Sequence, residues 1–157
     1  MKNKTIAVWL TLLLGSLGLH RRYLLGRFDA LALLLPIPTL LGCYGVLRAR
    51  TLGVDDQWSW VLMPLLGFTL AGCALAAIVY GLMSAQQWNR RFNPQAAEDA
   101  AEGSSTWLTV IGLGVALMLG TTVLMASLAF SIQRYFEHQM EQASSLSQTS
   151  TLKKSAD

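Results

Sequence analysis

The stretch Gly15-Ser16-Leu17-Gly18-Leu19-His20-Arg21-Arg22-Tyr23-Leu24-Leu25-Gly26-Arg27 decides the fold, because it breaks the continuity of an apolar N-terminal half. Three glycines, one histidine and three arginines fall within thirteen residues, and apolar segments flank them on both sides. Glycine permits sharp changes of backbone direction. The stretch therefore predicts a short polar corner that joins two membrane-embedded helices.

The composition excludes an ordinary soluble domain. Of 157 residues, 53% are hydrophobic and only 13% are charged, whereas soluble domains carry about 25% charged residues. The apolar residues also form long runs, as a hydrocarbon layer of ~30 Å requires. The net charge of +3 comes mostly from residues between these runs, and no soluble basic cluster points to nucleic acid. We expect the lipid bilayer as the main partner.

Four apolar segments organise the chain, and open strands cannot cross lipid. We predict an all-α integral membrane bundle of four transmembrane helices, built as two helical hairpins. Residues 1–56 form the first hairpin and residues 57–140 the second, with a polar loop at 84–106. Residues 141–157 are rich in serine and threonine and are expected to be a disordered tail. The segments themselves are residues 5–19, 28–47, 58–83 and 107–132.

The first segment is short, spanning about 22 Å as a helix. It must therefore extend into the corner, thin the membrane locally, or lie partly re-entrant. Its basic start and small residues also resemble a cleavable signal peptide. Arg21 and Arg22 would directly follow the cleavage point, where positive charge resists export. We expect the segment to be retained.

Small residues and prolines predict how the other segments pack. Pro36 and Pro38 stand inside the second segment and predict a kinked helix whose freed carbonyls find partners in neighbouring helices. Small residues four apart let helices approach closely in lipid. The third and fourth segments are expected to pack through such positions, which are Gly67, Ala71, Gly72, Ala76, Gly112, Ala116 and Gly120.

Few residues suggest chemistry. Cys43 and Cys73 both lie in apolar segments, where a thiol acts as a small hydrophobe, and no disulfide is expected. Asp29 lies at a segment edge, where headgroup depth is the favoured interpretation. His20 and His138 could serve as axial haem ligands, but the signal is weak. We expect no catalytic residues, no metal site and no cofactor.

The corner and its flanks resemble the TM2 domain family, some of whose bacterial members are called NINE proteins. The pattern is Lys2-Asn3-Lys4, an apolar helix, and Gly15-x-x-Gly18-x-His20-Arg21-x-Tyr23-x-x-Gly26. It covers about residues 1–56, and Asp55 or Asp56 stands where the family often ends in aspartate. Arg22 replaces a common aromatic residue, and the spacing from Tyr23 to Gly26 is one residue longer than usual. The resemblance implies a two-helix membrane unit without established enzymatic activity.

The corner itself has two interpretations. It stabilises the turn, or it contacts a lipid headgroup or a protein partner. The residues that would make such contacts are Gly15, Gly18, His20, Arg21, Arg22, Tyr23, Gly26 and Arg27.

The function expected is that of a non-enzymatic, multi-pass scaffold or interaction protein of a bacterial cytoplasmic (inner) membrane. A transport or channel component is the alternative, and a membrane redox subunit would rest only on the two histidines. Another membrane protein or a second copy of the chain is a further expected partner. Four crossings would place both termini on one side with seven Lys and Arg residues against five, so both termini are expected in the cytoplasm.

Overall fold

The computed structural model describes residues 1–26, 30–53, 56–97 and 100–156, with side chains described as far as Gln148. Arg27, Asp29, Asp55, Glu98 and Asp99 lie outside the described residues. Within these ranges the regular structure is entirely helical, as predicted. The elements are α1 (Lys4–Leu14), η1 (Gly15–Leu17), α2 (Leu19–Leu25), α3 (Ala30–Leu34), α4 (Pro36–Leu52), α5 (Gln57–Leu82), α6 (Ala85–Phe92), η2 (Ala101–Gly103) and α7 (Trp107–Ala156).

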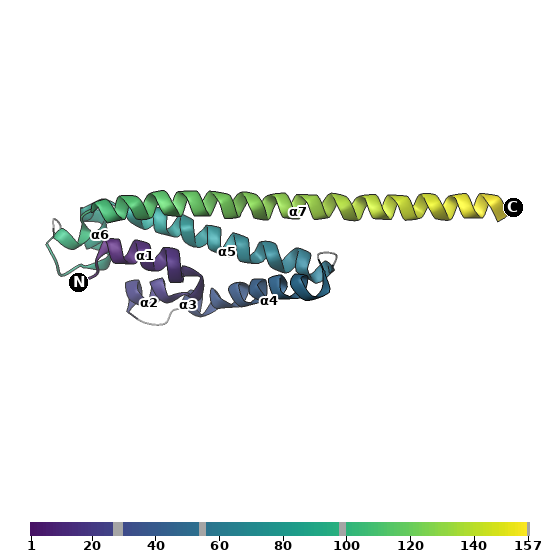
Figure 1. The fold of residues 1–157 in the computed structure, drawn as a ribbon. Helices are drawn as coiled ribbons and strands as arrows, with labels where there is room; N and C mark the ends of the chain where they lie inside the picture. The colour runs from purple at the N-terminus through teal and green to yellow at the C-terminus, as the bar shows by residue number, and fades with distance from the viewer. Residues whose placement is uncertain (27–29, 54–55, 98–99, 157) are drawn as a thin grey trace.

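Three long helical stretches form the body of the molecule (Figure 1). They cover Ala30–Leu52, Gln57–Leu82 and Ala101–Gln148, and each is long and apolar enough to cross a membrane. The helix α5 lies between α4 and α7 and also contacts α1. The predicted membrane class fits these helices, but a bundle of four transmembrane helices is not confirmed, because the fourth candidate is much shorter.

The N-terminal segment turns back on itself. α1 ends at Leu14, η1 follows, and Gly18 then adopts a left-handed φ of 76° before α2 begins. The backbone N–H of Asn3 donates to the Tyr23 hydroxyl at 3.0 Å, so the end of α2 lies beside the start of α1. The polar corner is therefore largely helical. The short segment therefore forms a compact helical hairpin with α2.

The termini consequently lie at opposite ends of the bundle (Figure 1). α4, α5 and α7 run back and forth three times, while the N-terminal hairpin begins and ends at the same end. The expected arrangement with both termini on one side requires a fourth crossing helix, and the N-terminal apolar helix covers only Lys4–Leu17.

Pro36 and Pro38 interrupt the helical stretch Ala30–Leu52, and α3 and α4 are separate elements within it. α3 ends at Leu34, and Pro36 begins α4, where its missing N–H costs little. The Thr39 hydroxyl donates to the carbonyls of Ser16 at 2.9 Å and Leu35 at 3.1 Å. The bond to Ser16 ties the start of α4 to η1.

Glycines bring the long helices close together. A Cβ on Gly42 or Gly45 of α4 would collide with Leu66 or Leu62 of α5, and a Cβ on Gly67 would collide with Ser127 of α7. The α4 glycines were not singled out from the sequence. Close backbone approach is the usual basis of helix association in lipid.

The far end of the α4–α5 pair is fixed by Asp56. Its carboxylate accepts hydrogen bonds from Arg48 at 2.7 and 3.0 Å and from the Ser59 backbone at 3.1 Å. Asp56 is therefore both the N-cap of α5 and the ion-pair partner of α4. The same hydrogen bonds, those from Arg48 first, lower the pKa of Asp56 to about 2.

Two regions predicted as irregular contain helix. The 84–106 loop holds α6 and η2, and α7 continues through the predicted disordered tail to Ala156. The sequence has no glycine or proline after Gly120, and Ser144, Ser145 and Ser147 donate to carbonyls three residues earlier. Nothing in this part of the sequence breaks a helix, which agrees with the continuation of α7 through it.

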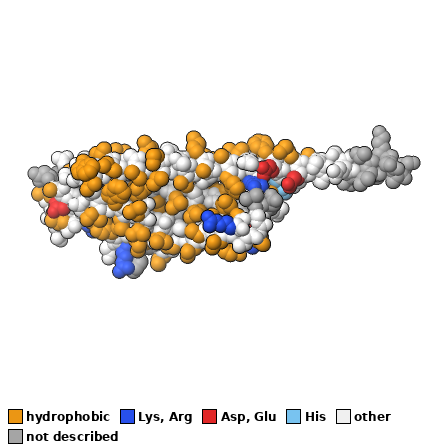
Figure 2. Space-filling model, in the orientation of Figure 1, with side chains coloured by type: hydrophobic (Ala, Val, Ile, Leu, Met, Phe, Trp, Pro, Cys, Tyr) orange, Lys and Arg blue, Asp and Glu red, His pale blue; other side chains and the backbone are white. Residues whose placement is uncertain are grey.

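Apolar side chains cover the middle of the bundle, and charged ones gather towards its ends (Figure 2). Large apolar residues are exposed on α3, α4 and α7 in particular, among them Leu33, Leu40, Leu47, Val110, Met118 and Met125. A soluble monomer rarely exposes so continuous an apolar surface.

Candidate functional site

The N-terminal end of the bundle is assembled around the first residues of the chain. The Asn3 side chain caps α1 by accepting from the backbone of Thr5 at 2.9 Å and of Ile6 at 3.4 Å. The Lys2 ammonium donates to the carbonyl of Leu24 at the end of α2. Asn3 is therefore a conventional N-cap of α1, and its neighbour Lys2 connects the start of α1 to the end of α2.

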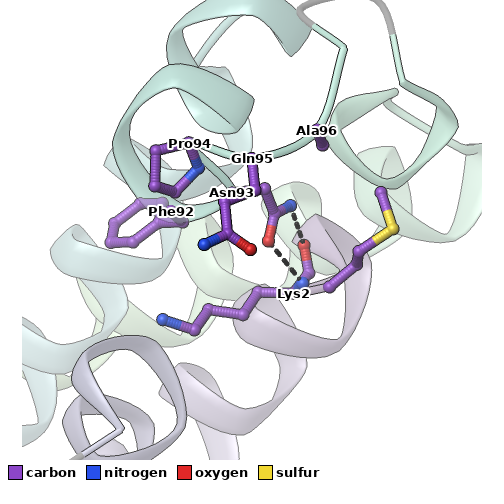
Figure 3. Close-up of a pocket in the computed structure, with 7 residues that line it drawn as sticks. Lys2, Phe92, Asn93, Pro94, Gln95 and Ala96 are labelled. Atoms are coloured by element: carbon purple, nitrogen blue, oxygen red, sulfur yellow. Dashed lines mark hydrogen bonds between the residues drawn. The ribbon is translucent and has the colours of Figure 1, made fainter.

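α6 holds the same residues from another direction. The backbone N–H of Lys2 donates to the Asn93 side chain at 2.7 Å, and the Lys2 carbonyl accepts from Asn93 at 3.0 Å (Figure 3). The Trp88 indole also donates to that carbonyl, at 2.9 Å. Ser84 and Gln87 form a capping box that begins α6. This short helix and its C-cap residue therefore place Trp88 and Asn93 beside the backbone of Lys2.

Lys4 is buried and makes two hydrogen bonds at this junction. Its side chain is 1% exposed, and its ammonium donates to the carbonyl of Met83 at 2.9 Å and to the Ser105 hydroxyl at 2.6 Å. Burial of an amine is costly unless it is hydrogen-bonded. Lys4 therefore connects the start of α1 to the end of α5 and to the residues that precede α7.

An aromatic cluster lies beneath this polar junction, with Tyr80 of α5 at its centre. The ring of Tyr80 lies 6.4 Å from that of His20, 6.4 Å from Trp88 and 6.1 Å from Phe92. Trp88 is 0% exposed, and His20 is 4% exposed. His20 is thus a packed residue of the cluster and does not lie on the outer surface.

Three adjoining cavities open around these residues. One of about 500 Å³ and one of about 410 Å³ share Lys2, Phe92 and Pro94. The second shares Arg21 and Tyr80 with a third, of about 530 Å³, which runs down between α4 and α5. The middle cavity is lined by three cationic side chains, those of Lys2, Arg21 and Arg91.

The structure brings some predicted corner residues together and separates others. His20 and Arg21 line the third cavity, and the Tyr23 hydroxyl accepts from Asn3. Arg22 is exposed and lines none of the three cavities. Gly26, with a φ of 71°, ends α2, while Arg27 lies outside the described residues.

The two buried corner glycines have packing roles. A Cβ on Gly15 would lie 3.1 Å from the Cβ of Cys73, and a Cβ on Gly18 would collide with the carbonyl of Ala32. They allow the turn to press against α5 and α3. Cys73 and Cys43 are both free thiols, as expected.

The predicted small-residue face divides among three environments. Gly120 packs on Ala74 of α5, but Gly112 packs on Val8 and Trp9 of α1. Ala116 is fully buried where α1, α5 and α7 meet. Gly67 and Gly120 therefore lie between α5 and α7, whereas Gly112 lies between α7 and α1.

The other small positions on α5 face cavities. Ala71 borders a hollow between α5 and α7. Gly72 and Ala76 line the third cavity described above, and a Cβ on Gly72 would meet nothing within 4 Å. Gly72 and Ala76 were predicted to lie at a helix interface. In the structure both residues line one wall of this cavity.

The two histidines lie too far apart to ligate one haem within the chain. His20 neighbours Tyr80, and His138 stacks edge-on against Trp60 at 5.8 Å. Twenty residues of α5 separate Tyr80 from Trp60, a distance of about 30 Å along the helix. The redox alternative loses the observation on which it rested.

Sequence reasoning missed the N-terminal anchor. The residues involved come from two segments about 90 residues apart, with Lys2 in one and Trp88, Arg91 and Asn93 in the other. The second segment was predicted only as a polar loop. No family model, no curated protein and no solved structure matches the chain.

Proposed function

We propose that this chain is a non-enzymatic scaffold or interaction protein of a bacterial cytoplasmic membrane, with three crossings and a re-entrant N-terminal hairpin. Three helices of sufficient length and apolarity support the crossings. α1 and η1 together cover only Lys4–Leu17, and their return through α2 supports re-entry. The resemblance to the TM2 domain family supports a non-enzymatic membrane unit.

Charge supports an orientation with the N-terminal end in the cytoplasm. Among described side chains, that end carries six Lys and Arg residues: Lys2, Lys4, Arg21, Arg22, Arg90 and Arg91. The opposite end carries three, namely Arg48, Arg50 and Arg134. Cytoplasmic flanks are the richer in Lys and Arg. The C-terminal part of α7 then lies outside the cytoplasm.

Cysteine labelling in intact cells distinguishes three crossings from four. In a Cys43→Ala, Cys73→Ala background, single cysteines are placed directly after Met1, at Ser104→Cys and at Ser147→Cys. An impermeant maleimide should label the cysteine at 147 and spare the other two. Labelling of the first position together with 147, with 104 protected, would instead require four crossings. Equal labelling at 104 and 147 would mean that both positions lie on one side of the membrane and that α7 does not cross it.

The interaction role rests on one observation, the exposure of α7 beyond the bundle. The His138–Trp60 contact lies near the start of α5, and every side chain described from Gln139 to Gln148 is exposed. Residues 139–156 extend about 27 Å past this contact. Met140 and Leu146 are 64% and 71% exposed there. A helix that presents exposed apolar residues beyond the bundle is suited to a partner.

Photo-crosslinking tests this role. Benzoyl-phenylalanine replaces Leu146, and the matched control replaces Leu128, an exposed residue within the apolar part of α7. We expect a discrete protein adduct from position 146, either of another membrane protein or of a second copy, and lipid adducts from position 128. Lipid adducts alone at both positions would contradict an interaction role for this helix.

A further inference from the structure

The middle and third cavities together form one amphipathic groove. They share Arg21 and Tyr80, so the cationic hollow continues directly into the hollow between α4 and α5. The upper part holds the side chains of Lys2, Arg21 and Arg91. The lower part is walled by apolar residues such as Leu35, Leu65 and Phe68. No acidic residue is among the described residues that line either part.

The groove has the length of one lipid leaflet. Its α5 wall extends from Leu65 to Tyr80, which is about 22 Å along the helix, and one leaflet with its headgroups is about 20–22 Å thick, half of a bilayer of about 40–45 Å. Tyr80 lies two residues before the end of α5. The cationic part therefore lies where headgroups are expected, and the apolar part reaches towards the middle of the bilayer.

The open position of Gly72 keeps the apolar part of the groove accessible. Gly72 is exposed, and a Cβ there would meet nothing within 4 Å. Small residues on membrane helices usually bring a neighbouring helix close. Here the described neighbours leave space instead, and a slender alkyl chain fits that space.

We propose that this groove binds one anionic phospholipid. The phosphate lies among Lys2, Arg21 and Arg91, and one acyl chain lies along Phe68 and Gly72. Charge complementarity selects the occupant, since cationic side chains near a membrane surface attract anionic lipids and the apolar wall requires a chain of matching polarity. The proposal rests on the membrane placement proposed above and assigns a ligand class to the N-terminal end.

Two matched pairs of variants test the site. Arg91→Gln removes a cation that lines the groove, whereas Arg90→Gln removes its exposed neighbour, which does not line it. Gly72→Leu fills the apolar part. Gly114→Leu adds the same side chain to α7 at another exposed glycine with nothing within 4 Å. Each pair controls for charge or for the leucine itself.

The measurement is native mass spectrometry of the full chain in detergent, titrated with phosphatidylglycerol or with phosphatidylcholine. We expect one retained phosphatidylglycerol, with preference over phosphatidylcholine. Arg91→Gln should weaken its retention about fivefold, the effect of one cation near an anionic surface. Gly72→Leu should abolish retention. Arg90→Gln and Gly114→Leu should bind as the unmodified chain does.

Several results would overturn the proposal. Equal retention of the two lipids would contradict selection by charge. Equal effects of the two variants within either matched pair would show that the lipid does not bind in this groove. Competition by inorganic phosphate as effective as that by the lipid would identify a soluble anion as the ligand. Carbonate extraction of the membranes from which the chain is purified distinguishes a failure of the lipid proposal from a failure of the proposed membrane function. A chain that stays in the membrane without retaining lipid refutes only the lipid site.

Discussion

Replacing Gly18 or Gly26 by alanine separates the cost of backbone geometry from the cost of packing. Both glycines are left-handed, with φ values of 76° and 71°. A side chain in that region costs about 1–2 kcal/mol. A Cβ on Gly26 meets nothing within 4 Å, whereas a Cβ on Gly18 collides with the backbone carbonyl of Ala32.

The collision adds a second term for Gly18 alone. Overpacking costs about 1–3 kcal/mol, so Gly18→Ala should destabilise the fold by about 2–5 kcal/mol and Gly26→Ala by about 1–2 kcal/mol. Changes in the unfolded chain are common to both variants. The difference between them, about 1–3 kcal/mol, therefore measures the contact between the turn and α3.

The assay is reversible unfolding in mixed micelles by increasing dodecyl sulfate, followed by tryptophan fluorescence. The result that would refute the reasoning is a difference below about 0.5 kcal/mol, less than the overpacking range, or a larger loss for Gly26→Ala. Either outcome would mean that the hairpin does not press on α3, and the re-entrant arrangement would lose its main packing argument.

Three further predictions concern other parts of the bundle. Trp88→Phe should cost about 1 kcal/mol through the lost bond to Lys2, and Trp88→Ala about 3–5 kcal/mol; equal losses in the micelle unfolding assay would count against a buried indole. Ala116→Leu should cost about 1–3 kcal/mol and release α1, read as faster proteolysis of the N-terminal residues; an unchanged digestion pattern would argue otherwise. The pKa of Asp56 is lowered from 3.8 to about 2, so its stabilising effect is complete above about pH 4 and is lost as the pH falls towards 2. Asp56→Asn should flatten that part of the stability curve, and an unchanged curve would contradict the ion pair with Arg48.

The helical class could be predicted because its cause is local. Long apolar runs, low charge and the prolines at 36 and 38 act over a few turns of helix, and the structure places long helices over the corresponding residues. The start of α4 at Pro36 follows from the missing amide of proline. The course of residues 5–19 was harder to predict. A segment of that length can extend into the corner, thin the membrane locally or lie partly re-entrant.

The candidate site could be predicted only in part. His20, Arg21 and Tyr23 were found because they are adjacent in a recognisable corner. Lys2 and Arg91 were missed because their association depends on tertiary contacts between distant segments. The same reason explains Gly112, whose spacing fitted α5 while its actual neighbours are Val8 and Trp9. Periodicity identifies a smooth helix face but does not identify which helix covers it.

The anchoring of Lys2 by Asn93 also sets an order of events during synthesis. The two residues are 91 positions apart, and Thr5 and Thr109, which bond at 2.8 Å, are 104 apart. At about 5–20 residues per second, roughly 5–20 s pass before the ribosome supplies the partners of the first residues. The N-terminal hairpin therefore docks after α5 and α6 have been made. Anything that occupies the N-terminus during that interval, such as a bulky fusion, competes with the last step of assembly.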